Sequence, residues 1–141
     1  MNFLTPRNIT LGFYAAAAVN IAGILLFSMA YTNTLLSALY PAVFSTFSLL
    51  CIQIWGLAYL SVAHSYAKVP LLIAVFALEK FAYFVTWLVW MRHFWRDLPD
   101  LLSKSFLTAN FYAVYGLIDL SFGLFFAVVA FKSWQNATTS R

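Results

Sequence analysis

Long runs of apolar residues, separated by short polar breaks, set the pattern along this chain. Four runs are long enough for a helix to cross roughly 30 Å of hydrocarbon, which takes about 20 residues. Pro41 and Pro70 fall at the start of the second and third runs, and the first turn of a helix favours proline. The four predicted spans are residues 10–30, 42–63, 70–91 and 106–132.

These runs predict helices rather than strands. A membrane-spanning β-barrel needs alternating apolar and polar positions, whereas residues 71–76 are apolar without interruption. We therefore expect an all-α fold, with one membrane domain over residues 1–141 built as an antiparallel, up-and-down bundle of four transmembrane helices. The first run also has features of a secretory signal, since Arg7 precedes it. Asn20 at its centre is unusual in such a segment, so we expect a true span.

The composition narrows the class of protein further. Hydrophobic residues make up 64% of the chain and charged residues 9%, against roughly 45–50% and about 25% in an ordinary soluble domain. A globular chain of 16.0 kDa has too little interior to bury that excess of apolar residues. The composition therefore excludes a soluble enzyme, a nucleic-acid-binding module and a disordered chain. The expected partner is the lipid bilayer, and the net charge of +4 indicates contact with lipid headgroups rather than nucleic acid.

The positions of the basic residues predict the orientation, because lysine and arginine are more frequent on the cytoplasmic side. With the amino terminus in the cytoplasm, the basic residues on that side are Arg7, Lys68, Lys132 and Arg141. Those on the opposite side are Arg92, Arg96 and Lys104. We expect both termini to be cytoplasmic and the protein to be a multi-pass protein of the cell's inner or plasma membrane.

A polar residue lies at the midpoint of every predicted span. These residues are Asn20, Gln53, the pair Glu79 and Lys80, and Asp119. A charged residue at this depth costs about 2.5–3.5 kcal/mol on the insertion scale. The third helix, which carries two of them, is therefore marginal alone, and we expect it to insert stably when neighbouring helices shelter its charges.

Helical spacing extends the polar positions into stripes on the third and fourth spans. Tyr83 follows Glu79 by one turn, and Tyr115 precedes Asp119 by one turn. Lys80 lies about 100° round the helix from Glu79, so both cannot point straight at the bundle axis. We expect the long stem of Lys80 to bend inward or to reach Asp119 on a neighbouring helix.

Small and polar residues share a face on the first two spans. Thr46, Gln53 and Gly56 lie together on the second span, and Ala16 flanks Asn20 on the first. Small residues allow close approach of helix backbones, and amide side chains often tie membrane helices together. Asn20 and Gln53 therefore have two open interpretations, as structural ties and as parts of a site.

The preferred hypothesis is a polar pocket near the bilayer midplane that binds a small amphipathic or hydrophobic ligand, such as a quinone, a sterol-like compound or an isoprenoid. Bundles place largely apolar sites with a few polar groups between their helices. The protein would then act as an accessory subunit or a sensor, alone, as a homo-oligomer or with a partner membrane subunit. The predicted ligand-binding residues are Asn20, Gln53, Glu79, Lys80, Tyr83, Tyr115 and Asp119.

Three other functions remain open. Ionisable residues inside a membrane often belong to ion or proton pathways, so Glu79, Lys80 and Asp119 could form a relay in an oligomeric transporter or channel. The two carboxyl groups could also act as acid and base in an isomerase of a lipid substrate, which requires both within about 3 Å of it or of a bridging water. The third possibility is a scaffold without a ligand, in which the three charges are a structural ion network.

No nucleophile triad, phosphate-binding loop or metal-ligand cluster is present in the sequence, so it indicates no particular cofactor or metal. His64 and His93 follow spans that run in opposite directions. We expect them at opposite membrane faces, where they cannot share a haem or a metal.

The chain resembles small four-helix membrane proteins of the DoxX-like kind. The matching positions are Asn20, Pro41 with Phe44, residues 53–60 (QIWGLAYL), residues 78–80 (LEK), residues 116–119 (GLID) and Phe125. The resemblance implies a four-helix membrane bundle and, for some relatives, a role beside membrane redox enzymes or as chaperones. Gln53 stands where many of these chains carry an acidic residue, so an acid-dependent role does not transfer to it.

Overall fold

The computed structural model describes residues 4–139, and all regular secondary structure in this range is helical. Three segments are long and apolar enough to cross a membrane: Pro6–Phe27, Pro70–Lys104 and Phe106–Thr138. A fourth apolar helix, Thr46–Val62, is shorter. The prediction of an all-α protein with membrane-spanning helices is confirmed at this level. The predicted placement of Arg141 falls outside the described residues.

The first helical segment, which we call the first rod, is continuous over 22 residues. Its hydrogen-bonding pattern changes from α-helical to π-helical midway. It consists of α1 (Pro6–Ala18), the π-helical turn η1 (Val19–Gly23) and α2 (Ile24–Phe27). Thr5 caps its start by accepting a hydrogen bond from the Asn8 backbone. A π-turn inside an α-helix is uncommon and often coincides with a functional position. Here it coincides with Asn20.

The second predicted span is broken near its start. Pro41 does open a helix, as expected, but α4 (Pro41–Phe44) is a single turn. Ser45 is extended and its hydroxyl caps α5 (Thr46–Val62) by accepting from the Ser48 backbone. The expected start at residue 42 is therefore wrong for the long helix, which has 17 residues and a length of about 26 Å. The short helix α3 (Thr34–Leu39) precedes this break.

The second half of the chain contains the two longest helices. They are α6 (Pro70–Phe94), which follows the 3-10 turn η2 (Tyr66–Lys68), and α8 (Phe106–Thr139). The polar segment expected between them, residues 92–105, is largely helical: α6 continues to Phe94, and η3 (Trp95–Asp97) and α7 (Leu98–Lys104) follow. With 34 residues, α8 is about 51 Å long and passes the expected end of the fourth span.

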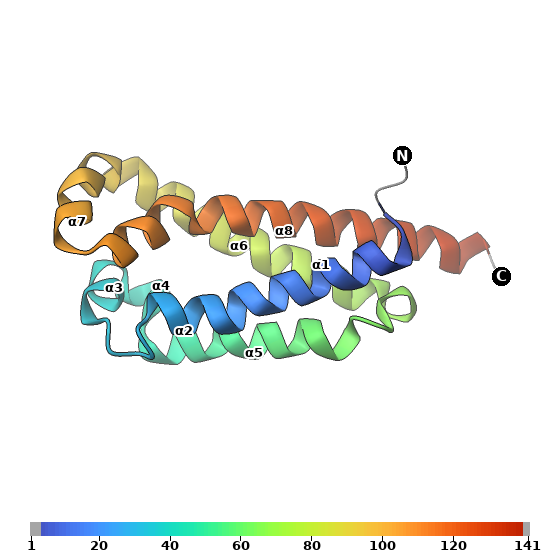
Figure 1. The fold of residues 1–141 in the computed structure, drawn as a ribbon. Coiled ribbons are helices and arrows are strands. Elements are labelled where there is room, and N and C mark those ends of the chain that lie inside the picture. Colours follow the sequence, from blue (N-terminus) through green and yellow to red (C-terminus); the bar gives the residue numbers. More distant parts are fainter. Residues whose placement is uncertain (1–3, 140–141) are drawn as a thin grey trace.

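The four long helical segments alternate in direction along the bundle (Figure 1). The start of α1 and the end of α8 lie at one end, and α3 and α7 lie at the other (Figure 1). We call these the terminal end and the α7 end. The most extensive contacts between helices are those of α6 with α8, followed by those of α1 with α5. The bundle is therefore two tightly packed helix pairs laid against each other.

The interior is aromatic at both ends of the bundle. Toward the terminal end, Phe13, Phe76 and Phe126 have no exposed surface and their rings pack together. Toward the α7 end, Phe44 packs edge-on against Phe111. The polar side chains predicted at the midplane lie between these two aromatic clusters.

The outer surface is apolar, which is the reverse of a soluble protein. Large apolar side chains are exposed on every long helix, including Leu11, Leu26, Ile54, Leu71, Leu117 and Leu124. Soluble monomers rarely expose contiguous apolar patches larger than a few hundred Å². A hydrocarbon surrounding is the physical explanation for this distribution.

Two glycines allow the helices within each pair to approach closely. A Cβ atom on Gly56 would lie 3.0 Å from the Asn20 Cβ and 3.2 Å from the Ala17 carbonyl oxygen. A Cβ on Gly116 would overlap the side chain of Trp87. These positions accept glycine alone, because a larger residue would push α1 from α5 or α8 from α6.

Candidate functional site

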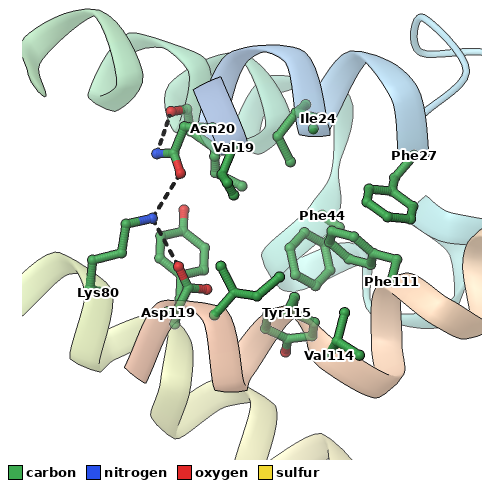
Figure 2. A pocket seen from close by; sticks show the side chains of 14 residues that line it. Val19, Asn20, Ile24, Phe27, Phe44, Lys80, Phe111, Val114, Tyr115 and Asp119 are labelled. Atoms are coloured by element: carbon green, nitrogen blue, oxygen red, sulfur yellow. Dashed lines mark hydrogen bonds and ion pairs between the residues drawn. The ribbon is translucent and has the colours of Figure 1, made fainter. Parts of the chain in front are cut away.

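Lys80 is the centre of a polar cluster inside the bundle. Its side chain is 2% exposed, and its Nζ donates hydrogen bonds of 2.8 Å to Asp119 Oδ1 on α8 and 2.8 Å to Asn20 Oδ1 on η1 (Figure 2). The expectation that the lysine stem reaches Asp119 is confirmed. An ammonium group has three donors, and these two bonds connect α6 to both neighbouring segments.

Glu79 completes the cluster from the other side of α6. Its Oε2 lies 3.8 Å from Lys80 Nζ and accepts a hydrogen bond of 2.5 Å from the Tyr59 hydroxyl on α5. Lys80 Nζ also lies 5.5 Å from the centre of the Tyr59 ring, within the range of a cation–π contact. The other carboxyl oxygen, Oε1, is buried and has no hydrogen-bond partner in the part of the chain that the structure describes.

The local backbone explains why these side chains meet. Successive residues of a helix are about 100° apart, so Glu79 faces α5 while Lys80 faces η1 and α8. The π-turn carries Asn20 into the space between the two helix pairs, where it is 3% exposed. Side chains from all four long segments therefore gather at one depth.

Asn20 and Gln53 also tie the first rod to α5. Asn20 Nδ2 donates to the Ile52 carbonyl at 3.0 Å, and Gln53 Nε2 donates to the Ile21 carbonyl at 3.3 Å. We call this reciprocal pair the amide clasp. The clasp supports the structural interpretation for Gln53, whereas Asn20 serves both the clasp and Lys80.

The side-chain oxygen of Gln53 accepts a hydrogen bond from a strained turn. Its Oε1 accepts from the Tyr31 hydroxyl. Met29, Ala30 and Tyr31 all have left-handed backbone angles, with φ of 50°, 51° and 70°. This region is unfavourable for residues other than glycine. Asn33 helps to hold the turn by donating to the Phe27 carbonyl at 2.9 Å.

A cavity of about 60 Å³ lies beside the Lys80 cluster, between the first rod and α8. One end is polar, with Lys80, Asn20 and Asp119, and its walls are apolar and aromatic (Figure 2). The aromatic residues of the wall are Phe27, Phe44, Tyr83, Phe111 and Tyr115.

The cavity opens toward the side of the bundle. Val19 on η1 and Val114 on α8 line it, and they are 38% and 36% exposed. Gly23 and Ile118, which also line it, are half-buried. The opening therefore faces the side of the bundle rather than either end. We call this space the crevice.

The structure divides the seven predicted residues into two groups. Five line the crevice: Asn20, Lys80, Tyr83, Tyr115 and Asp119. Glu79 and Gln53 do not line it, because Glu79 faces Tyr59 and Gln53 belongs to the amide clasp. The sequence thus indicated the right depth. It was wrong in grouping Glu79 and Gln53 with the five residues that line the crevice.

Residues of the second predicted span account for the main omissions. Tyr59 is fully buried and contacts Glu79, and Phe44 forms part of the crevice wall. The predicted face included Thr46, which is exposed, whereas the buried face carries Ile52, Gly56 and Tyr59. Extending the face from Gly56 by three residues would have found Tyr59.

The histidines lie at opposite ends of the bundle, as expected. His64 follows α5 near the terminal end, and its Nε2 pairs with the Tyr14 hydroxyl at 2.6 Å. His93 is in the last turn of α6, and its Nδ1 pairs with the Val89 carbonyl at 2.8 Å. Within residues 4–139, no three histidine, cysteine or acidic side chains are grouped so that they could hold a metal ion.

No protein-family model matches this chain, and neither a curated protein nor a solved structure matches it. The resemblance to DoxX-like proteins therefore stays a prediction, and the function is argued from the site itself.

Proposed function

We propose that this chain is a four-span membrane protein with both termini on the cytoplasmic side. Three segments meet the length of a span, and α5 is about 26 Å long. That length falls a few ångströms short of the hydrocarbon thickness, a mismatch that a bilayer accommodates at modest cost. Ile54 and the leucines exposed on α5 support a position among lipids.

We further propose that the crevice binds a small lipid-soluble molecule whose polar end accepts a hydrogen bond. The observation that carries this proposal is the buried ammonium of Lys80 at the polar end of an otherwise aromatic cavity. Two of its donors are directed to Asn20 and Asp119. The ammonium also lines the crevice, so a carbonyl or hydroxyl oxygen of a ligand at this end would lie beside a charged donor.

The volume of the crevice restricts the shape of the ligand. Sites for drug-sized ligands usually measure about 300–1,000 Å³, whereas the crevice measures about 60 Å³. A small hydroxyl or carbonyl end group followed by a narrow chain, as in an isoprenoid alcohol, suits this space better than a fused sterol ring or a substituted quinone ring. Because the opening faces the hydrocarbon, such a molecule would enter from the membrane.

Two alternatives receive less support from the geometry. A transport path must reach both ends of the bundle, but the polar cluster lies across it at one depth. The fully buried rings of Phe13, Phe76 and Phe126 close the interior toward the terminal end. An isomerase that uses two carboxyl groups needs both at one substrate atom, and Asp119 lines the crevice whereas Glu79 does not.

The binding proposal can be tested by native mass spectrometry of the protein purified in mild detergent. We expect a retained small molecule, or a one-to-one adduct after addition of farnesol, a probe with one hydroxyl group at the end of a narrow isoprenoid chain. Ile118→Trp should fill the mouth of the crevice and abolish the adduct. Leu117→Trp, on the exposed face of the same helix turn, is the matched control. Equal adducts in both variants would refute the crevice as the site.

A further inference from the structure

A second hollow lies on the lipid-facing side of the α6–α8 pair, away from the crevice. Near the terminal end it is a depression of about 530 Å³ that includes Lys68 and Thr138. It continues toward the midplane as a groove of about 430 Å³. The two parts share Pro70, Leu71 and Trp134, and neither shares a lining residue with the crevice.

The groove has a floor of alanines and walls of bulky apolar residues. Ala77 and Ala130 on the floor are 5% and 7% exposed, whereas Leu78 and Phe131 on the walls are 67% and 63% exposed. The small side chains create the depth, and the large side chains on both helices form its sides. This shape suits a narrow, flexible hydrocarbon chain.

The length of the groove matches one leaflet of a bilayer. It runs along α6 from Pro70 to Phe81, which is about 17 Å at 1.5 Å per residue. Half of the hydrocarbon core is about 15 Å thick. Phe81, whose ring lies against Gly123, closes the inner end beside Lys80 at the midplane.

Charge distinguishes the outer end of the groove. Arg7, Lys68 and Lys132 lie toward the terminal end, and none of the four acidic residues of the chain does so. Those acidic residues are Glu79 and Asp119 at the midplane and Asp97 and Asp100 at the α7 end. Among residues 4–139, Lys68 forms no ion pair, whereas Lys104 pairs with Asp100 at 2.6 Å. Trp134 lies at the outer end, and tryptophan prefers the headgroup level.

We propose that this groove is a binding site for one anionic phospholipid. An acyl chain lies on the alanine floor between α6 and α8, and the phosphate-bearing headgroup lies against Lys68. A basic surface attracts the anionic lipids of the cytoplasmic leaflet. The site is independent of the proposed crevice ligand, since the two are lined by different residues.

Native mass spectrometry with two lipids of identical chains tests this proposal. We expect dioleoylphosphatidylglycerol to form a one-to-one adduct with the detergent-purified protein at lower concentration than dioleoylphosphatidylcholine does. Lys68→Gln should reduce this preference roughly fivefold, the share expected of one lysine near the membrane surface. Lys104→Gln, which removes a lysine at the opposite end, should leave it unchanged.

A variant that fills the groove separates a built site from general surface attraction. Ala127→Leu should weaken the adducts of both lipids, whereas Ala18→Leu on the exposed side of α1 should not. If Ala127→Leu does not fold, as judged by circular dichroism, Ala74→Leu fills the groove from α6 instead. Equal binding of the two lipids, equal effects of Lys68→Gln and Lys104→Gln, or undiminished binding in the filled variants would overturn the proposal. A dimer that the filled variants dissociate would overturn it in favour of a second copy of this chain.

Discussion

At the scale of single residues, the two carboxylates beside Lys80 lie at different distances from its ammonium group. Asp119 Oδ1 accepts a direct hydrogen bond at 2.8 Å, whereas Glu79 Oε2 lies 3.8 Å away and is bound by Tyr59. A buried ion pair costs most when one partner is removed, because the other charge stays in a medium of low dielectric constant. The two acids should therefore respond differently to neutralisation.

We predict that Asp119→Asn lowers the free energy of unfolding by about 3 kcal/mol, the lower end of the range for breaking a buried pair. Glu79→Gln should lower it by less than about 1 kcal/mol, because its amide oxygen can still accept from Tyr59. Denaturant titration of the protein in detergent micelles, followed by tryptophan fluorescence, measures both. Equal losses for the two variants would contradict the assignment of Asp119 as the principal counter-ion.

The left-handed turn supplies a second prediction at this scale. Ala30 has φ of 51°, a conformation that costs an L-residue about 1–2 kcal/mol and costs glycine little. Ala30→Gly should therefore raise the free energy of unfolding by about 1 kcal/mol. Ala18→Gly, in a right-handed helical position, should lower it by about 0.5–1 kcal/mol. Thermal unfolding of both variants in the same detergent compares them, and a loss in Ala30→Gly would contradict the strain.

At the scale of helices, the amide clasp depends on the close approach of the first rod to α5. Gly56 permits this approach, since a Cβ there would lie within 3.0 Å of Asn20 and 2.8 Å of Ile21. The same approach brings Asn20 within reach of Lys80. Packing of the first rod against α5 therefore positions Asn20, which accepts a hydrogen bond from Lys80 of the other helix pair.

Gly56→Ala should separate the two helices and destabilise the protein by about 1–3 kcal/mol, the usual cost of overpacking. Gly23→Ala is the control, because its nearest neighbour, a Val19 methyl carbon, would lie 3.9 Å away. We expect no loss of stability in the control. Urea or detergent-exchange unfolding monitored by circular dichroism measures both. Helix propensity favours alanine over glycine in both variants, so a loss at Gly56 alone indicates packing, and similar losses in the two variants would contradict this assignment.

The rotation of α5 shows what a helix pattern alone does not specify. Apolar residues surround this helix, so the positions of Thr46, Gln53 and Gly56 were the available signal for its inner face. Thr46 is exposed and Tyr59 is buried. A helix that is hydrophobic all round carries little amphipathic information, and its neighbours set its rotation.

At the scale of the whole molecule, the number of spans decides whether the two ends of the chain share a membrane face. Four spans place Arg7 and Thr138 on the same side and Lys104 on the other. If α5 did not cross, the three long segments would place Arg7 and Thr138 on opposite sides. The proposed topology therefore has a direct test.

We predict that cysteines at Arg7 and Thr138 react with a membrane-impermeant maleimide only after the cells are opened. A cysteine at Lys104 should react in intact cells. The measurement uses single-cysteine variants on a Cys51→Ala background, since Cys51 is the one native cysteine. Different labelling at positions 7 and 138 would exclude four spans, and a reversal at all three positions would invert the orientation.

Several features followed from the sequence alone. The apolar runs determined that the chain folds as membrane-type helices, because run length and composition are local properties of the chain. The midplane depth of Asn20, Glu79, Lys80 and Asp119 was equally local, since it follows from their places within the runs. The reach of Lys80 to Asp119 was also foreseeable from the length of its side chain.

Which side chains meet depended on how the helices pack in three dimensions. This packing separated Glu79 from the crevice, assigned Gln53 to the clasp, brought Tyr59 to Glu79 and placed Phe44 in the crevice wall. These outcomes depend on the π-turn, on the break at Ser45 and on how one helix pair lies against the other. Apolar side chains pack in many rotations at nearly equal free energy, so the contacts between helices select one arrangement.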